Sequence, residues 1–143
     1  MLLALTLGGC AFVPQDVQLN PSVTFRPADI GAGREVQVRI LDGRPSEVFG
    51  RKISGYGAAA AIRGSSGNTH TVFRSTVFQI LENQAFVPQD EAAESVLRLE
   101  ICSISIEAGQ TLFAFDVRST AAIKALGDRG GRIIYERVYR GHS

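Results

Sequence analysis

Hydrophobic and polar residues alternate most cleanly over residues 35–41, where three aliphatic side chains share one side of an extended chain. Such period-two alternation is typical of a strand with one buried face. Residues 42–45, Asp-Gly-Arg-Pro, are turn-forming residues. We therefore predict a strand over residues 35–41, a loop over residues 46–57 and a short second strand over residues 58–63.

The next segment, residues 69–84, repeats its apolar residues at the helical period and predicts an amphipathic helix. Asn68 or Thr69 can cap its start, and the helix must end before Pro88, whose ring prevents its continuation. The predicted apolar stripe comprises Val72, Phe73, Thr76, Val77, Ile80 and Leu81.

Three more strands are predicted, over residues 95–106, 112–124 and 132–140. The alternation changes phase inside the first of them, which indicates a β-bulge near Cys102 and Ser103. Residues 127–131, Gly-Asp-Arg-Gly-Gly, have the composition of a hairpin turn between the last two strands.

This order of elements predicts an α+β fold, in which a four-stranded antiparallel sheet (β-(β)-α-β-β-β) carries one amphipathic helix on one face. Residues 34–143 would form this single domain. Because one helix covers only part of such a face, we expect a second, C-terminal helix that is missing after residue 143.

The N-terminus has the features of a lipoprotein precursor. Residues 1–9 are apolar and uncharged, too short to span a bilayer but typical of the apolar core of a signal peptide. Leu7-Gly8-Gly9-Cys10 matches a lipobox, whose cysteine thiol accepts a diacylglyceryl group. No Lys or Arg precedes the apolar run, so we expect the signal peptide to be truncated at its start. The alternative is a buried segment with a core cysteine.

Residues 10–33 are predicted to be a lipidated tether, because their three prolines favour extended structure over a helix. Alternatively they lie on the domain, since Val17 and Leu19 alternate like an edge strand. Ala11 follows the cysteine where an inner-membrane sorting signal usually has Asp, which favours the periplasmic face of the outer membrane. Two acyl chains would anchor the protein stably there.

Six residues occur twice without change, as Ala-Phe-Val-Pro-Gln-Asp at 11–16 and at 85–90. The flanking residues do not match, so the pair is not a structural repeat of the solenoid kind. No physical reason for the recurrence follows from the pattern.

Composition narrows the function classes. The 143 residues suffice for one domain, and 15 basic against 14 acidic residues give a net charge of +1. A nucleic-acid-binding domain needs a basic face, for which this balance gives no support. We predict no cofactor, no metal and no nucleic-acid partner, and we expect the chain not to be an enzyme.

The residues that carry chemistry are few. A hydrolase that uses His70 is a remote alternative, because Gly64-Ser65-Ser66-Gly67 lacks the spacing of a nucleophile elbow. Cys102 is interpreted as a small core residue. Asp42 and Arg44 allow two interpretations: a strand-end turn with local pairing, or a possible recognition loop formed together with Arg51.

The lipobox, the turn at 42–45 followed by Gly50-Arg51, the step from the helix into Ala85-Phe86 and the final Tyr135 and Tyr139 resemble the YajG-type lipoproteins of Gram-negative bacteria. The resemblance implies a C-terminal helix after the last strand, and it implies no catalytic residue and no ligand. The predicted function is a non-catalytic envelope lipoprotein that binds a partner protein or an envelope component. The alternative is an auxiliary subunit of an envelope transport or lipopolysaccharide-assembly machine.

Overall fold

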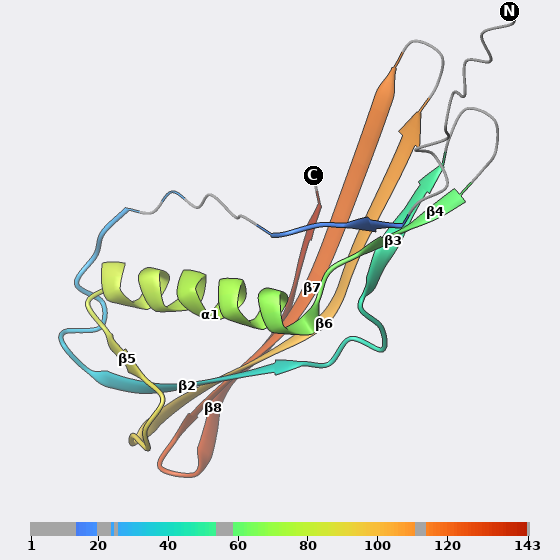
Figure 1. The fold of residues 1–143 in the computed structure, drawn as a ribbon. Coiled ribbons are helices and arrows are strands. Elements are labelled where there is room, and N and C mark those ends of the chain that lie inside the picture. The colour runs from blue at the N-terminus through green and yellow to red at the C-terminus, as the bar shows by residue number, and fades with distance from the viewer. Residues whose placement is uncertain (1–13, 20–23, 25, 54–58, 111–113, 143) are drawn as a thin grey trace, which may run out of the picture.

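The computed structural model describes residues 14–19, 24, 26–53, 59–110 and 114–142, which form one mixed eight-stranded sheet with a helix against it (Figure 1). The helix is α1 (Ser66–Asn83). The strands are β1 (Gln15–Asp16), β2 (Glu35–Asp42), β3 (Val48–Ile53), β4 (Ala59–Arg63), β5 (Val87–Gln89), β6 (Ser95–Gln110), β7 (Phe115–Arg129) and β8 (Arg132–His142).

The longest strand, β6, organises the sheet. One of its edges pairs in parallel with β2 over residues 95–101 and then with β3 over residues 106–109. Its other edge pairs with β7 in an antiparallel ladder that continues to β8. The strands β2 and β3 therefore follow one another along the same edge of β6. The short loop between them lies beside the middle of β6, which is a single continuous strand there.

The predicted four-stranded antiparallel sheet is wrong. The sheet is mixed, because β6 is parallel to both β2 and β3 while β7 and β8 are antiparallel additions. The predicted loop over residues 46–57 contains β3, whose alternation is broken by Gly50 at a register shift against β4. Alternation reports which face a residue occupies, but it does not report which strand lies alongside or in which direction.

The predicted bulge in β6 is confirmed, since the register against β7 shifts between Ile101 and Ser103. Simple alternation along a strand would place Ile101 on one face and Ile104 and Ile106 on the other. The extra residue in the bulge brings all three to the same face of the sheet. That face carries two apolar clusters, one under α1 and one around the nearly fully buried Phe49. The bulge thus allows one long strand to serve both clusters.

The helix α1 covers the first cluster with Phe73, Val77 and Leu81, as the predicted stripe requires. It begins earlier than expected, because Ser65 rather than Asn68 or Thr69 caps it. The Oγ of Ser65 accepts a hydrogen bond from the backbone N–H of Asn68 at 3.2 Å. This bond satisfies one of the donors that a helix start leaves free.

The described parts of the predicted tether lie on the domain. Val17 and Leu19 pack against the Phe49 cluster, and β1 extends the sheet beside β4. Further along, the backbone N–H of Gly31 donates to the carbonyl of Gln84 at 2.7 Å, just after α1 ends. The signal peptide and Cys10 are outside the described residues.

Each copy of the repeated hexapeptide contributes described residues to a short strand. Residues 15–16 are β1 and residues 87–89 are β5, the first and last strands of the order β1-β4-β3-β6-β2-β5, and both pair in parallel with their neighbours. Proline lacks a backbone donor and is tolerated at such edges. The repeat therefore has the composition of a short edge strand.

We predict that Gly50→Ala destabilises the fold by about 1–3 kcal/mol, as overpacking does. A Cβ atom at Gly50 would overlap the backbone carbonyl of Ile106 across the parallel β3–β6 pair, and backbone cannot move aside as a side chain can. The measurement is urea unfolding of the two proteins. Gly109→Ala, at a position where a Cβ meets nothing within 4 Å, is the matched control and should leave stability unchanged or slightly raised. Equal losses in both variants would contradict the packing argument.

Candidate functional site

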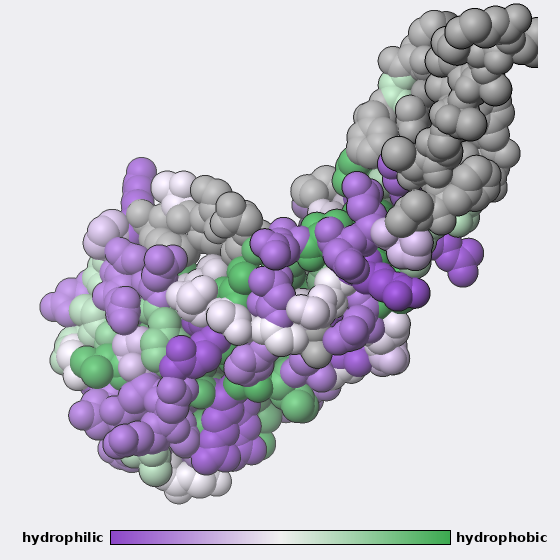
Figure 2. All heavy atoms as spheres, viewed as in Figure 1, coloured by the Kyte–Doolittle hydropathy of each residue, from purple (hydrophilic) through white to green (hydrophobic). Residues whose placement is uncertain are grey.

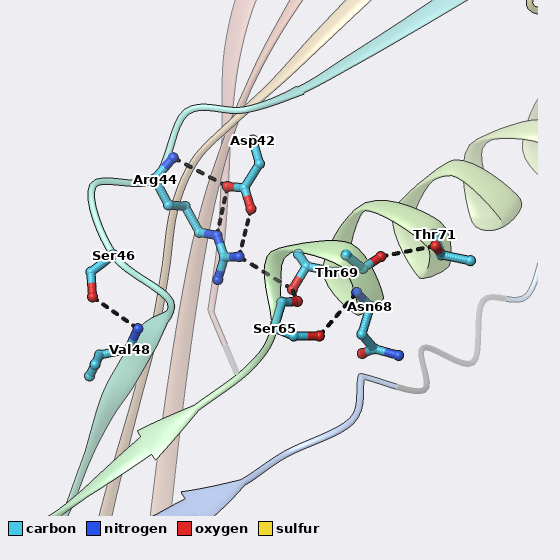
Figure 3. Close-up of polar contacts among 9 residues, drawn as sticks. Asp42, Arg44, Ser46, Val48, Ser65, Asn68, Thr69 and Thr71 are labelled. Atoms are coloured by element: carbon cyan, nitrogen blue, oxygen red, sulfur yellow. Dashed lines mark hydrogen bonds and ion pairs between the residues drawn. The ribbon is translucent and has the colours of Figure 1, made fainter.

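Asp42 and Arg44 form a bidentate ion pair at the corner where β2 ends (Figure 3). The Nε of Arg44 donates to Oδ1 of Asp42 at 2.8 Å, and Nη2 donates to Oδ2 at 2.7 Å. The backbone N–H of Arg44 donates to the same carboxylate at 3.2 Å. The hydrogen bond from the Arg44 side chain holds the pKa of the Asp42 carboxyl below its usual value, and the pKa of Arg44 is raised in turn.

The Arg44 guanidinium also joins this corner to α1. It lies over the ring of Phe49, 4.8 Å from its centroid, and Nη2 donates to the Thr69 hydroxyl at 3.3 Å. The side chain of Arg44 is only 3% exposed, and Thr69 is nearly fully buried. The local pairing that the sequence allowed is therefore present, and it links β2, β3 and α1.

Arg51 is not brought to this corner. It lies on β3 opposite Glu107 of β6 and lines an open hollow of about 680 Å³, on the sheet face away from α1. Two basic and two acidic side chains line this hollow, so it has no preference for a ligand of one charge. They are Arg51, Arg118, Glu107 and Asp116.

The last strand presents apolar side chains to solvent along its length. All 11 residues of β8 are exposed, including five large apolar ones that we call the β8 surface. Tyr135 and Tyr139 lie on the side that carries α1, because they pair with Gly127 and Ile123 of β7. Their hydroxyls are hydrogen-bonded to each other. The β8 surface comprises Ile133, Ile134, Tyr135, Val138 and Tyr139.

A groove next to the β8 surface extends it toward α1. It has a volume of about 280 Å³ and a mainly apolar lining that includes Leu81 of α1, Phe86, Leu97 and Ile134. Figure 2 shows hydrophobic residues reaching the surface among hydrophilic ones in the half of the molecule that carries α1. This groove and the β8 surface give the domain apolar contact area at one end of its sheet.

The sequence interpretation did not select the β8 surface as a site. A signal was present, because apolar residues occupy both faces of the predicted strand 132–140, whereas a strand with one buried face alternates apolar with polar. Solvent exposure could not be inferred from that signal, since it depends on how far α1 reaches across the sheet.

Other chemically active side chains are scattered. His70 lies in α1 near enough to Asp42 to help lower the pKa of that carboxyl, and His142 lies at the end of β8. Cys102 is half-buried at the β6 bulge with a free thiol. Within the described ranges, no group of three or more His, Cys, Asp or Glu side chains is placed to hold a metal ion. The helix of the described part is not apolar enough to cross a membrane.

No family model and no curated protein matches the sequence. The fold is similar to that of protein XCC0632 from Xanthomonas campestris, described as DUF330, with a TM-score of 0.53 and 8% identity over 90% of this chain and 76% of that one. A second crystal structure, described as an uncharacterized protein, matches with a TM-score of 0.50 and 10% identity over 92% of this chain and 80% of that one. At these identities the likeness concerns the fold alone.

We predict that Asp42→Asn lowers the free energy of unfolding at pH 7 by about 2–3 kcal/mol, because the buried Arg44 loses a charged acceptor. A lowered pKa in the fold means that the ionised carboxylate stabilises the protein above its unfolded pKa near 3.9 and ceases to do so as the pH falls through the folded value. The difference between wild type and variant should therefore shrink in acid. Urea unfolding at pH 7 and at successively lower pH measures it.

The matched control is Glu94→Gln, which removes an exposed ion pair to Arg129 with a 3.0 Å separation. Exposed pairs contribute less than about 1 kcal/mol, so this variant should unfold almost like the wild type. A difference between wild type and Asp42→Asn that stays constant down to acid pH would rule out the ionised pair as the cause.

Proposed function

We propose that this chain is a non-catalytic envelope lipoprotein that binds a partner protein through the β8 surface and its adjoining groove. The observation that carries the proposal is the exposure of five large apolar side chains on one edge strand. Tyr135 and Tyr139 share the face that carries α1, and Ile134 lines the groove on that side, whereas Ile133 and Val138 lie on the other face. An exposed apolar patch of the kind that Ile134 and the two tyrosines form beside the groove marks an interaction site more often than scattered apolar residues do. Aromatic side chains such as Tyr135 and Tyr139 are the residues that interfaces favour.

The chemistry of this surface favours binding over catalysis. The groove offers apolar walls, and the two tyrosines add hydroxyls that engage each other. The only ion pair with a nearly fully buried side chain among those described is Asp42–Arg44, and its guanidinium already serves to join β2, β3 and α1. The β8 surface and its groove therefore suit a partner protein that presents a complementary apolar segment.

The membrane anchor in the proposal rests on sequence. Leu7-Gly8-Gly9-Cys10 has the lipobox pattern, and the resemblance to YajG-type lipoproteins supports the same assignment. Ala11 supports the periplasmic face of the outer membrane. If the partner is a component of an envelope transport or lipopolysaccharide-assembly machine, the chain is an auxiliary subunit of that machine.

We predict that Cys10→Ser abolishes incorporation of a palmitate analogue in cells that express the chain from a functional leader. The serine hydroxyl is a much weaker nucleophile than the thiol and does not accept the diacylglyceryl group. Cys102→Ser is the control for other acylation and should retain the label. Label kept by the Cys10→Ser variant would exclude the anchor, whatever the domain binds.

We predict that Tyr139→Glu reduces recovery of the stoichiometric partner from crosslinked membranes by about tenfold, the effect of losing roughly 1.4 kcal/mol at an interface. Leu41→Glu is the matched control, because Leu41 is also an exposed apolar residue but lies on β2, on the sheet face away from α1. The measurement is quantitative mass spectrometry of proteins that co-purify with each variant. Equal losses in both variants, or none in either, would show that the β8 surface is not the contact.

A further inference from the structure

We infer that two copies of this chain associate through the edges of β8, which pair antiparallel about a twofold axis at Val138. The inference concerns the backbone edge of the strand, whereas the proposed function uses its side chains and the adjoining groove. The two share Val138 and Tyr139, so the experiments below measure dimer formation and capture of the partner separately.

The outer edge of β8 is available for pairing. The strand bonds to β7 on one side, and no other strand of the described part pairs with it. A strand edge presents a row of unpaired N–H and C=O groups, which proteins commonly protect with charged side chains, above all lysine, with proline or with a bulge. Residues 135–142 contain neither proline nor lysine, and the register shift against β7 lies before them. Within the part of the chain that the structure describes, no strand pairs with this edge.

Charge selects the register of this pairing. Residues that lie opposite each other in an antiparallel pair point to the same face of the sheet. When two identical strands pair about a twofold axis normal to the sheet, the axis must therefore lie between the two copies of one residue. An axis at Glu136 places two carboxylates opposite each other, and an axis at Arg137 does the same with two guanidiniums. Like charges directly opposite destabilise a sheet.

An axis at Val138 or at Tyr139 avoids both conflicts, but only the axis at Val138 places an acidic side chain opposite an arginine. Val138 then lies opposite itself, and Glu136 of each copy lies opposite Arg140 of the other, so that two pairs of opposite charge form. Glu136 already holds Lys124 of its own sheet at 2.7 Å. It would then lie between two cations on the face away from α1, and pairing of this kind stabilises cross-strand neighbours.

The other face of the sheet fits the same register. Arg137 lies over the Tyr139 ring of its own chain, 5.8 Å from the centroid, and would lie opposite Tyr139 of the second copy. Tyr135 would lie opposite Gly141, beside which even an added Cβ would meet nothing within 4 Å. The core cluster under α1 reaches β7 but contains no residue of β8, so the helix leaves the edge open to a second sheet.

The test is disulfide formation in membranes that hold the full-length chain. In the inferred register the two copies of Val138 have Cβ atoms about 5 Å apart, and Val138→Cys crosslinks under mild oxidation. His142→Cys is the matched control, because it lies on the same strand and face, is exposed and takes no part in the inferred charge pairs. Its two copies lie roughly 27 Å apart, eight residues out of register, so it should crosslink at least tenfold less.

A charge change tests the register separately. Arg140→Glu places two carboxylates opposite each other twice, and in the Val138→Cys background it should lower the yield of dimer several-fold, while Arg140→Lys should keep it. Mass spectrometry of the digested dimer must find the 138–138 linkage, since Cys102 is present in every variant. Equal crosslinking at positions 142 and 138, an absence of dimer, or a dimer yield unchanged by Arg140→Glu overturns the inference. Loss of dimer with the partner of Tyr139 still captured would leave the proposed function intact.

Discussion

The fold depends on one constraint, that β2 and β3 must share a single edge of β6. The edge has room for both because β6 is 16 residues long, but the chain has to leave it at the end of β2 and return a few residues later. Asp42 and Arg44 occupy that corner. Their bidentate pair holds the turn, and the same guanidinium reaches Phe49 and Thr69. A buried pair of this kind is more useful for fixing geometry than for net stability, since desolvation cancels much of the attraction.

The bulge at Cys102 is the other half of this arrangement. At the level of β6 where the corner interrupts its neighbours, one extra residue restores apolar side chains to the face that α1 and Phe49 cover. The phase change that reveals the bulge is local and could be predicted from the sequence. The helix and the strand at 35–41 were predictable for the same reason, because periodicity over several residues reports a buried face, whereas the last hairpin was predictable from its glycine-rich turn.

What could not be predicted is the pairing. Parallel neighbours such as β2 and β6 are about 60 residues apart in sequence, and no local pattern states their direction. The edge strands β1 and β5 are too short to show a period. The candidate site shows the same difference between local features, which the sequence predicts, and strand pairing, which it does not. The local partnership of Asp42 with Arg44 was one of two interpretations of the sequence, whereas the separation of Arg51 depends on its facing away from α1, which only the paired sheet determines.

The width of one helix explains why β8 is exposed. A helix with its side chains is roughly 10 Å wide, which is about twice the 4.8 Å spacing between neighbouring strands. One helix therefore covers about three strands, and α1 lies over β2, β6 and β7. In the described part of the chain, the next strand, β8, therefore has an uncovered face as well as an unpaired edge, and the face and the edge suit different partners. The unpaired edge can form backbone hydrogen bonds with an identical strand when opposite charges of the two strands lie across from each other. The face needs apolar side chains, which such a strand does not supply, because it extends the same exposed face. The two proposed contacts, a second copy at the edge and a different protein over the face, therefore answer different features of β8 and do not compete for the same groups of the strand.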